Sequence, residues 1–207
     1  MKSSLLILSL VISTGLIAQK GDLNLSKWHL HDNVEASDYQ LIKKTELYYF
    51  LSNDNDNIYI DMKIEDPRVQ DKILKEGLII WINMDGKTLK KMGVRYPIGA
   101  QSPTPLSFAN TIELIGFTNE QKKHFPSENP DNFRGSVRYD DEGILYYKMI
   151  MPIAKLPIRN SKEGNGAMPF ILGIEYGFSS SLHTIDNSRG RTTELHWIKN
   201  VKLATSK

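Results

Sequence analysis

Alternation of apolar and polar side chains with a period of two is the main pattern along this chain. The clearest run extends from Ile58 to Ile64, where every second residue is apolar, as expected for a strand with one buried face. An apolar and aromatic run at 47–51 precedes it. The stretch 52–57 between the two runs is rich in Asn and Asp, residues that favour tight turns. These features predict a β-hairpin.

A second strand pattern, at residues 78–82, is apolar at every position. A strand of this kind is expected in the middle of a sheet that is covered on both faces. We therefore expect Trp81, which lies in this run, to be a core residue. Asp85-Gly86 is a turn signal after the strand. Further strands are predicted at 92–96, 111–117, 134–152 as a hairpin, 170–178 and 195–203.

One segment favours a helix, between the strands at 58–64 and 78–82. Asp66 can cap its first turn, and Pro67 suits the first helical position because no N–H is needed there. Val69 and Ile73 share one helical face, and Gly77 can end the helix in a left-handed conformation. Eight or nine short strands with one short helix predict an all-β fold, an antiparallel β-sandwich of the immunoglobulin or jelly-roll kind.

The first residues have the features of a secretory signal peptide. Lys2 follows the initiator, residues 5–12 are apolar, and small or weakly polar residues follow. The apolar run is shorter than the roughly 20 residues that cross a bilayer. We therefore expect a signal peptide at 1–19 and a single β-sandwich domain at 20–207. The expected location is periplasmic or extracellular.

Composition narrows the partners further. The chain has 207 residues, a formal net charge of +2 and no cysteine. Without cysteine it forms no disulfides and cannot be a bacterial lipoprotein. No basic block suggests a nucleic-acid partner, and no second apolar stretch is long enough for membrane insertion. The oligomeric state is left open by the sequence.

The stretch 46–97 combines several short motifs. They are Ser52-Asn53-Asp54, Asn57-Ile58-Tyr59-Ile60, Asp66-Pro67, Gly77-Leu78-Ile79-Ile80-Trp81-Ile82, Gly86-Lys87 and Gly93-Val94-Arg95-Tyr96-Pro97, preceded by Leu25-Ser26-Lys27-Trp28. Together they resemble exported bacterial proteins with a domain like the family-9 carbohydrate-binding module, within the DOMON-like β-sandwich group. The resemblance implies a sugar ligand held between tryptophans. The resemblance also implies haem as an alternative ligand, because related DOMON-type domains hold haem through Met and His.

Exposed aromatic side chains are the candidate sugar-binding residues, because a flat ring stacks on the apolar face of a sugar. The candidates are Trp28, Tyr96 and Trp197. The alternative for each is packing within the fold. Gly173 and Gly177 leave one face of their strand without side chains, which would allow a ligand or a backbone to approach closely.

Metal ligation has two candidate sets. Asp54 and Asp56 offer hard oxygen ligands that suit Ca²⁺, although their stretch also reads as a solvated hairpin tip. His29 and His31 fall on one side of an extended segment, with His183 or His196 as a third ligand brought by folding. The alternative for these histidines is an ordinary place on the surface.

Haem ligation would use a methionine paired with a histidine across the core. The candidate methionines, Met62, Met84, Met149 and Met151, lie in strand patterns, where methionine commonly fills a core. No other cofactor is expected.

No catalytic motif stands out. The chain has no H-E-x-x-H, G-x-S-x-G or P-loop sequence, and Ser179-Ser180-Ser181 with His183 has no spacing that indicates a nucleophile. The leading interpretation is a secreted, non-catalytic binding module, with carbohydrate as its ligand by resemblance. The alternatives are an enzyme whose site is built from the loops 97–110, 118–133 and 179–193, and a haem-binding DOMON-like carrier.

Overall fold

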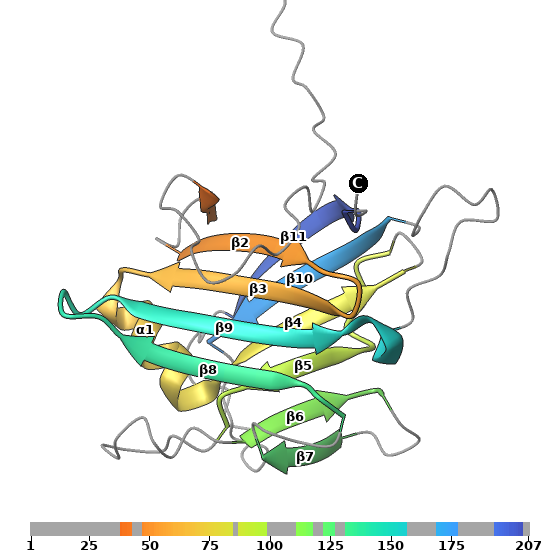
Figure 1. Ribbon diagram of the computed structural model, residues 1–207. Coiled ribbons are helices and arrows are strands. Elements are labelled where there is room, and N and C mark those ends of the chain that lie inside the picture. The colour runs from red at the N-terminus through yellow and green to blue at the C-terminus, as the bar shows by residue number, and fades with distance from the viewer. Residues whose placement is uncertain are drawn as a thin grey trace, which may run out of the picture.

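The computed structural model describes residues 38–42, 47–84, 87–98, 111–117, 131–156, 169–177 and 193–204, and the backbone of 122–126. These residues form two antiparallel sheets packed face to face (Figure 1). The predicted antiparallel β-sandwich with one short helix is confirmed.

The first sheet has five strands in the order β1-β2-β3-β9-β8 and lies nearest the viewer in Figure 1. Its strands are β1 (Gln40–Ile42), β2 (Leu47–Asn53), β3 (Asn57–Ile64), β8 (Arg134–Tyr139) and β9 (Leu145–Pro152).

The second sheet has six strands in the order β11-β10-β4-β5-β6-β7. Its strands are β4 (Leu78–Asn83), β5 (Gly93–Tyr96), β6 (Thr111–Ile115), β7 (Lys122–Pro126), β10 (Phe170–Tyr176) and β11 (Glu194–Val201).

The helix α1 (Pro67–Glu76) joins β3 to β4, as the sequence predicts. The Asp66 side chain accepts a hydrogen bond from the backbone N–H of Arg68, and Pro67 opens the helix. Gly77 ends it with φ +83° and ψ 175°, so the expected positive φ is present while ψ is extended rather than left-handed helical. Buried Gln70 donates to the carbonyls of Ile64 and Gly143, 2.9 Å each, and so holds α1 against both hairpins.

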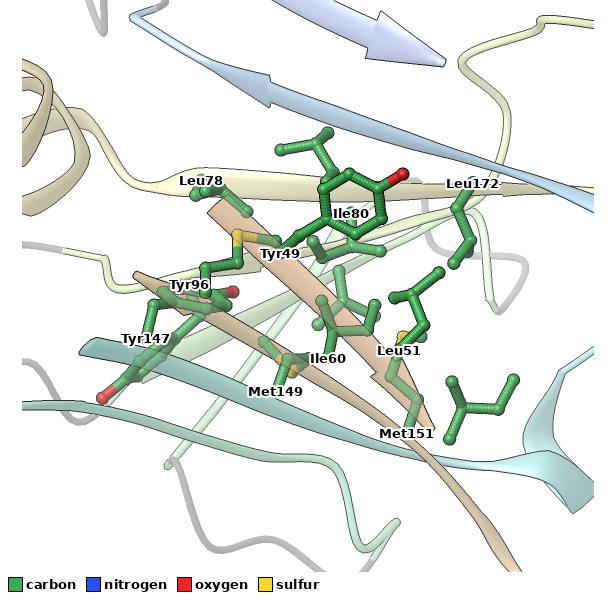
Figure 2. Packing of buried hydrophobic residues seen from close by; sticks show 14 of the residues in the cluster. Tyr49, Leu51, Ile60, Leu78, Ile80, Tyr96, Tyr147, Met149, Met151 and Leu172 are labelled. Atoms are coloured by element: carbon green, nitrogen blue, oxygen red, sulfur yellow. The ribbon is translucent and has the colours of Figure 1, made fainter. Parts of the chain in front are cut away.

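The core lies between the sheets and follows the period-two pattern. Ile58, Ile60, Met62 and Ile64 of β3 are fully buried there. Figure 2 shows the packing between the two sheets: Ile60, Leu51, Met149 and Met151 from one sheet lie against Leu78, Ile80 and Leu172 from the other. Burial of this apolar area is the main stabilising contribution to the fold.

Strand β4 is buried along its whole length, which confirms the predicted central strand. Leu78, Ile80 and Ile82 point into the core between the sheets. The alternate residues Ile79 and Trp81 are also buried but belong to the opposite, outward face of the six-stranded sheet. Trp81 is therefore a buried residue, as predicted, although it does not lie between the two sheets.

The structure also contains a strand that the sequence analysis missed. The segment 118–133 was expected to be an irregular loop, but its residues 122–126 form β7, which pairs antiparallel with β6. This expectation was wrong because β7 is a polar edge strand without apolar alternation. Edge strands often carry charged residues and proline, which weakens the usual pattern.

Candidate binding site

The outward face of the six-stranded sheet carries two tryptophans in one cross-strand row. Trp197 of β11 lies opposite Gly173 of β10, Gly173 lies opposite Trp81 of β4, and Trp81 lies opposite Gly93 of β5. Tryptophan and glycine therefore alternate across four neighbouring strands. We call this outward surface the tryptophan face.

Each indole ring lies against the glycine next to it. A Cβ atom placed on Gly173 would lie 2.6 Å from an atom of the Trp197 ring, and one on Gly93 would lie 2.7 Å from Cε3 of Trp81. Such distances are too short for a real Cβ, so glycine is what allows the rings to lie flat on the strands. The sequence suggested an open sheet face at Gly173, but the ring of Trp197 fills it.

Charged side chains form the next row of the tryptophan face. Glu175 of β10, Arg95 of β5 and Glu113 of β6 lie in one cross-strand row, with Ile79 of β4 between the first two. Glu175 and Glu113 are both buried. A buried charge costs several kcal/mol unless it is paired and hydrogen-bonded. The partners of these carboxylates therefore decide what the row can do.

Glu175 is held from two sides. One carboxylate oxygen accepts a hydrogen bond from the indole N–H of Trp81, and the other accepts one from Lys90 Nζ at 2.6 Å. The bond from Trp81 fixes the indole relative to the carboxylate. Lys90 is half-exposed at the rim, so the Glu175 carboxylate links the buried ring to solvent-facing charge.

Arg95 plays the same part on the other side of Ile79. Its Nη1 lies 3.5 Å from Oε2 of Glu113, and its Nε donates to the carbonyl of Glu76 at 2.9 Å. A second guanidinium N–H donates to the same carbonyl. The carbonyl belongs to the last residue of α1, where cations are stabilised by the helix dipole.

Asn83 adds a polar group two residues beyond Trp81 on the same side of β4. Its residue is 8% exposed, and its amide nitrogen has no hydrogen-bond partner among the described residues. Leaving a buried donor unsatisfied costs about 1–3 kcal/mol. The nitrogen is shielded from solvent, so a ligand hydroxyl would reach it only after the side chain moves.

The tryptophan face offers both kinds of contact that a polyhydroxylated ligand needs. Indole rings contact apolar C–H surface, while carboxylates, a guanidinium and an amide accept from or donate to hydroxyls. Glu175 and Glu113 lie three strands apart, about 14 Å at the usual strand spacing. Hydrolysis of a glycosidic bond needs two carboxyl groups about 5–9.5 Å apart. This pair therefore suits recognition rather than hydrolysis.

The predicted ring candidates have three different positions. Trp197 lies on the tryptophan face and is partly exposed. Tyr96 lies in the core, 3% exposed, with its ring 5.8 Å from that of Tyr147, so it has no open face for a sugar and the structure does not support it as a stacking residue. Trp28 lies outside the described residues.

The sequence analysis missed most of the tryptophan face. Trp81 was assigned to the core alone, and Glu175, Lys90, Arg95, Glu113 and Asn83 were not singled out. A usable signal was present, because Glu175 and Glu113 interrupt otherwise apolar strands at outward positions. A charge at such a position is either solvated or placed for a partner.

Asp54, a candidate calcium ligand with Asp56, has a structural task in this fold. One of its carboxylate oxygens accepts from the backbone N–H groups of Asp56 and Asn57, at 2.8 and 2.6 Å. The other accepts from the hydroxyl of Tyr59 at 2.5 Å. These bonds shape the β2–β3 hairpin, which is the alternative that the sequence left open. Within the described ranges, no three acidic or histidine side chains are grouped as a metal site.

The remaining candidates give no second site. Met62, Met149 and Met151 are fully buried among core side chains. His196 faces inward, 6.5 Å from the ring of Tyr49, and burial lowers the pKa of its imidazole. Several candidates lie outside the described residues: His29, His31 and the whole of 178–192, which includes Ser179–Ser181 and His183. Of the loop 97–110, residues 99–110 are also outside.

Two solved structures resemble this fold. Both are a carbohydrate-binding module of family 9 from Caldicellulosiruptor kristjanssonii, one in complex with glucose and one with cellotriose. Their TM-score is 0.41, with 11% and 10% sequence identity, and the match covers 89% of this chain and 97% and 93% of theirs. A scan against protein-family models finds no match. A search of curated proteins finds none either.

Proposed function

We propose that this protein is a non-catalytic binding protein whose tryptophan face holds a carbohydrate. The observation that carries the proposal is the side-by-side arrangement of indole rings and paired buried charges on one sheet face. Neither feature alone would be distinctive. Together they provide a stacking surface next to fixed hydrogen-bonding groups. A site with both features favours a sugar over an apolar ligand, which has no hydroxyls to bond.

The two tryptophans have different parts in this proposal. Trp197 is partly exposed, so its ring is the one that contacts the ligand directly. Trp81 is 6% exposed and donates to Glu175, so it positions the carboxylate. Lys90 and Arg95 lie beside the same region and carry N–H donors for hydroxyl oxygens.

The first prediction concerns Trp197. Loss of an aromatic stacking surface costs about 1–3 kcal/mol for nucleic-acid bases, and the same scale applied to a sugar gives roughly a tenfold loss of affinity or more. We expect Trp197→Ala to weaken binding by that amount with little change in the unfolding curve. Isothermal titration with glucose and cellotriose, followed by a broad glycan array, measures the effect.

Tyr139→Ala is the matched control, because Tyr139 is 42% exposed and lies on β8 of the other sheet. The control should bind as the unmodified protein does. If no glycan binds at millimolar concentration, the proposed ligand class is wrong. Equal weakening by Trp197→Ala and Tyr139→Ala would show that binding does not use the tryptophan face.

The second prediction concerns export. We propose that residues 1–19 direct the chain out of the cytoplasm to the periplasm or the medium, on the basis of Lys2 and the apolar run 5–12. Residues 1–37 lie outside the described part of the structure, and no described helix is long and apolar enough to cross a membrane. N-terminal sequencing should find a mature start between about Leu16 and Gly21. A membrane-bound product that retains Met1 would contradict this.

A further inference from the structure

The two buried carboxylates of the tryptophan face are held in different ways. Arg95, which pairs with Glu113, has a side chain that is 17% exposed and also donates to the carbonyl of Glu76 at 2.9 Å, so its guanidinium is fixed at several points. Lys90, which pairs with Glu175, has a side chain that is 46% exposed. Glu175 is its one partner among the described residues. An ion pair with so exposed a member contributes little to stability, so it opens and closes readily.

The Lys90 side chain passes Trp81 to reach its partner. In the register of β10 with β4, Glu175 lies one row beyond Trp81, toward the start of β4. Lys90 comes from the other end of that strand, because it lies two residues before Met92, whose carbonyl accepts from the N–H of Ile82. Its four-carbon stem therefore crosses the row of Trp81, and lysine stems commonly cover apolar surface in this way.

The Trp81 ring is held at both of its ends. A Cβ on Gly93 would lie 2.7 Å from Cε3, so the benzene part of the indole lies against Gly93. At the other end the indole N–H donates to the same carboxylate that binds Lys90, so the ammonium ends beside the pyrrole part of the ring. The outward plane of the indole is what remains for the lysine stem to cover, and Trp81 is 6% exposed in this structure.

We propose that Lys90 is a latch on the tryptophan face, whose bond to Glu175 keeps the lysine stem over Trp81 and occupies a carboxylate oxygen that a sugar hydroxyl would use. The part of the ligand rests on the proposed function, whereas the cover of the ring rests on the ion pair alone. A hydroxyl replaces the ammonium on Glu175, because a carboxylate oxygen accepts from either donor. The lysine then moves into solvent, where an ammonium is strongly hydrated, and the Trp81 ring becomes accessible beside that of Trp197.

The first test needs no ligand. The chain has three tryptophans, so in a Trp28→Phe/Trp197→Phe background the fluorescence reports on Trp81 alone. In that background Lys90→Ala should raise the acrylamide quenching constant by roughly twofold or more, because the ring loses its cover. Glu175→Gln should do the same. Its amide oxygen still accepts from the indole, the attraction for the lysine is lost, and no unpaired buried charge is left to disturb folding.

The second test measures cellotriose binding by isothermal titration, with the three tryptophans in place. Lys90→Ala should bind roughly threefold more tightly or better, because the ligand no longer has to displace the ammonium before it binds. Lys155→Ala is the matched control in both tests. Lys155, just after β9, is 49% exposed and pairs with Asp131 at 2.7 Å, so the control removes an equally exposed ion pair far from Trp81 in the fold.

The latch is overturned if neither Lys90→Ala nor Glu175→Gln raises the quenching of Trp81 above that of Lys155→Ala. It is also overturned if Lys90→Ala weakens cellotriose binding, because the lysine would then bind the sugar rather than shield the ring. Raised quenching in a protein that binds no cellotriose, with or without Lys90, would support the latch and contradict the proposed sugar ligand. Failure of the latch and failure of the proposed function are therefore distinguishable.

Discussion

At the scale of single residues, the most informative side chain in the core is Tyr147. It is 1% exposed, and among the described residues its hydroxyl has no hydrogen-bond partner. Its ring packs against Tyr96, which itself lies over Gly135 of β8, so rings from both sheets meet here (Figure 2). Burial raises the pKa of Tyr147 well above its usual value. The hydroxyl therefore costs desolvation free energy without a bond that offsets it.

The third prediction follows from this unsatisfied hydroxyl. Tyr147→Phe should leave the free energy of unfolding unchanged or raise it by about 1 kcal/mol, because removing an unpaired buried group removes its penalty. Tyr49→Phe is the control, since the Tyr49 hydroxyl donates to Gln40 at 2.9 Å. It should cost about 0.5–1.5 kcal/mol. Urea unfolding measures both, and a larger loss for Tyr147→Phe than for Tyr49→Phe would contradict the reasoning.

At the scale of elements, the central strands β4 and β10 of the six-stranded sheet are buried on both of their faces. Inward residues of β4 and β10 meet the opposite sheet, as period-two alternation predicts. On the outward side, the Trp81 ring lies against Gly93 and the Trp197 ring lies against Gly173. Gly93 and Gly173 leave the space that these rings occupy, so each tryptophan is paired with a glycine on the neighbouring strand.

The fourth prediction compares the two glycines. Gly93→Ala should cost about 1–3 kcal/mol, because its Cβ would lie 2.7 Å from the buried Trp81 ring and 3.1 Å from the backbone oxygen of Ile80. Gly173→Ala should cost less, since the three atoms nearest to its Cβ all belong to the partly exposed Trp197 ring, which can move. Displacing that ring should nevertheless weaken glycan binding. Urea unfolding and titration calorimetry measure the two effects.

A double variant tests the cause. In a Trp197→Ala background the clash is absent, so Gly173→Ala should have no further effect on glycan binding. An additional loss of affinity in the double variant would mean that Gly173 acts through something other than the Trp197 ring.

At the scale of the whole molecule, the end of the described chain is tied to a distant hairpin. Asn53, at the end of β2 in the five-stranded sheet, is 1% exposed. Its amide donates to the carbonyl of Ala204 at 3.1 Å and accepts from the N–H of Ala204 at 2.8 Å. Ala204 follows β11 of the six-stranded sheet, so one side chain links the two sheets beyond the core.

The fifth prediction concerns this link. Asn53→Ala should lower the free energy of unfolding by about 2–3 kcal/mol, because several hydrogen bonds are lost and the backbone groups of Ala204 lose their partner. Asn55→Ala, at an exposed position in the same hairpin, should stay within about 0.5 kcal/mol. Chemical denaturation checks both, and similar values for the two variants would show that the link contributes nothing.

The sequence predicted elements well wherever one local pattern was enough. The strand predicted at 58–64, the central strand at 78–82 and the capped helix between Asp66 and Gly77 follow from alternation, an unbroken apolar run and capping residues. The polar edge strand β7 was missed, because pairing with β6 rather than its own composition makes it a strand. Of the candidate site residues, Trp197 is on the tryptophan face, and Tyr96 is in the core.

By itself the sequence determined the sandwich class, the helix boundaries and the alternation of inward and outward side chains, because these depend on residues close together in the chain. Only the tertiary structure decided which outward residues meet. Trp81, Glu175 and Arg95 are far apart in sequence and become neighbours through the pairing of β10 with β4 and of β4 with β5. Strand order is set by packing of the whole chain, and a site built across strands therefore cannot be read from any one of them.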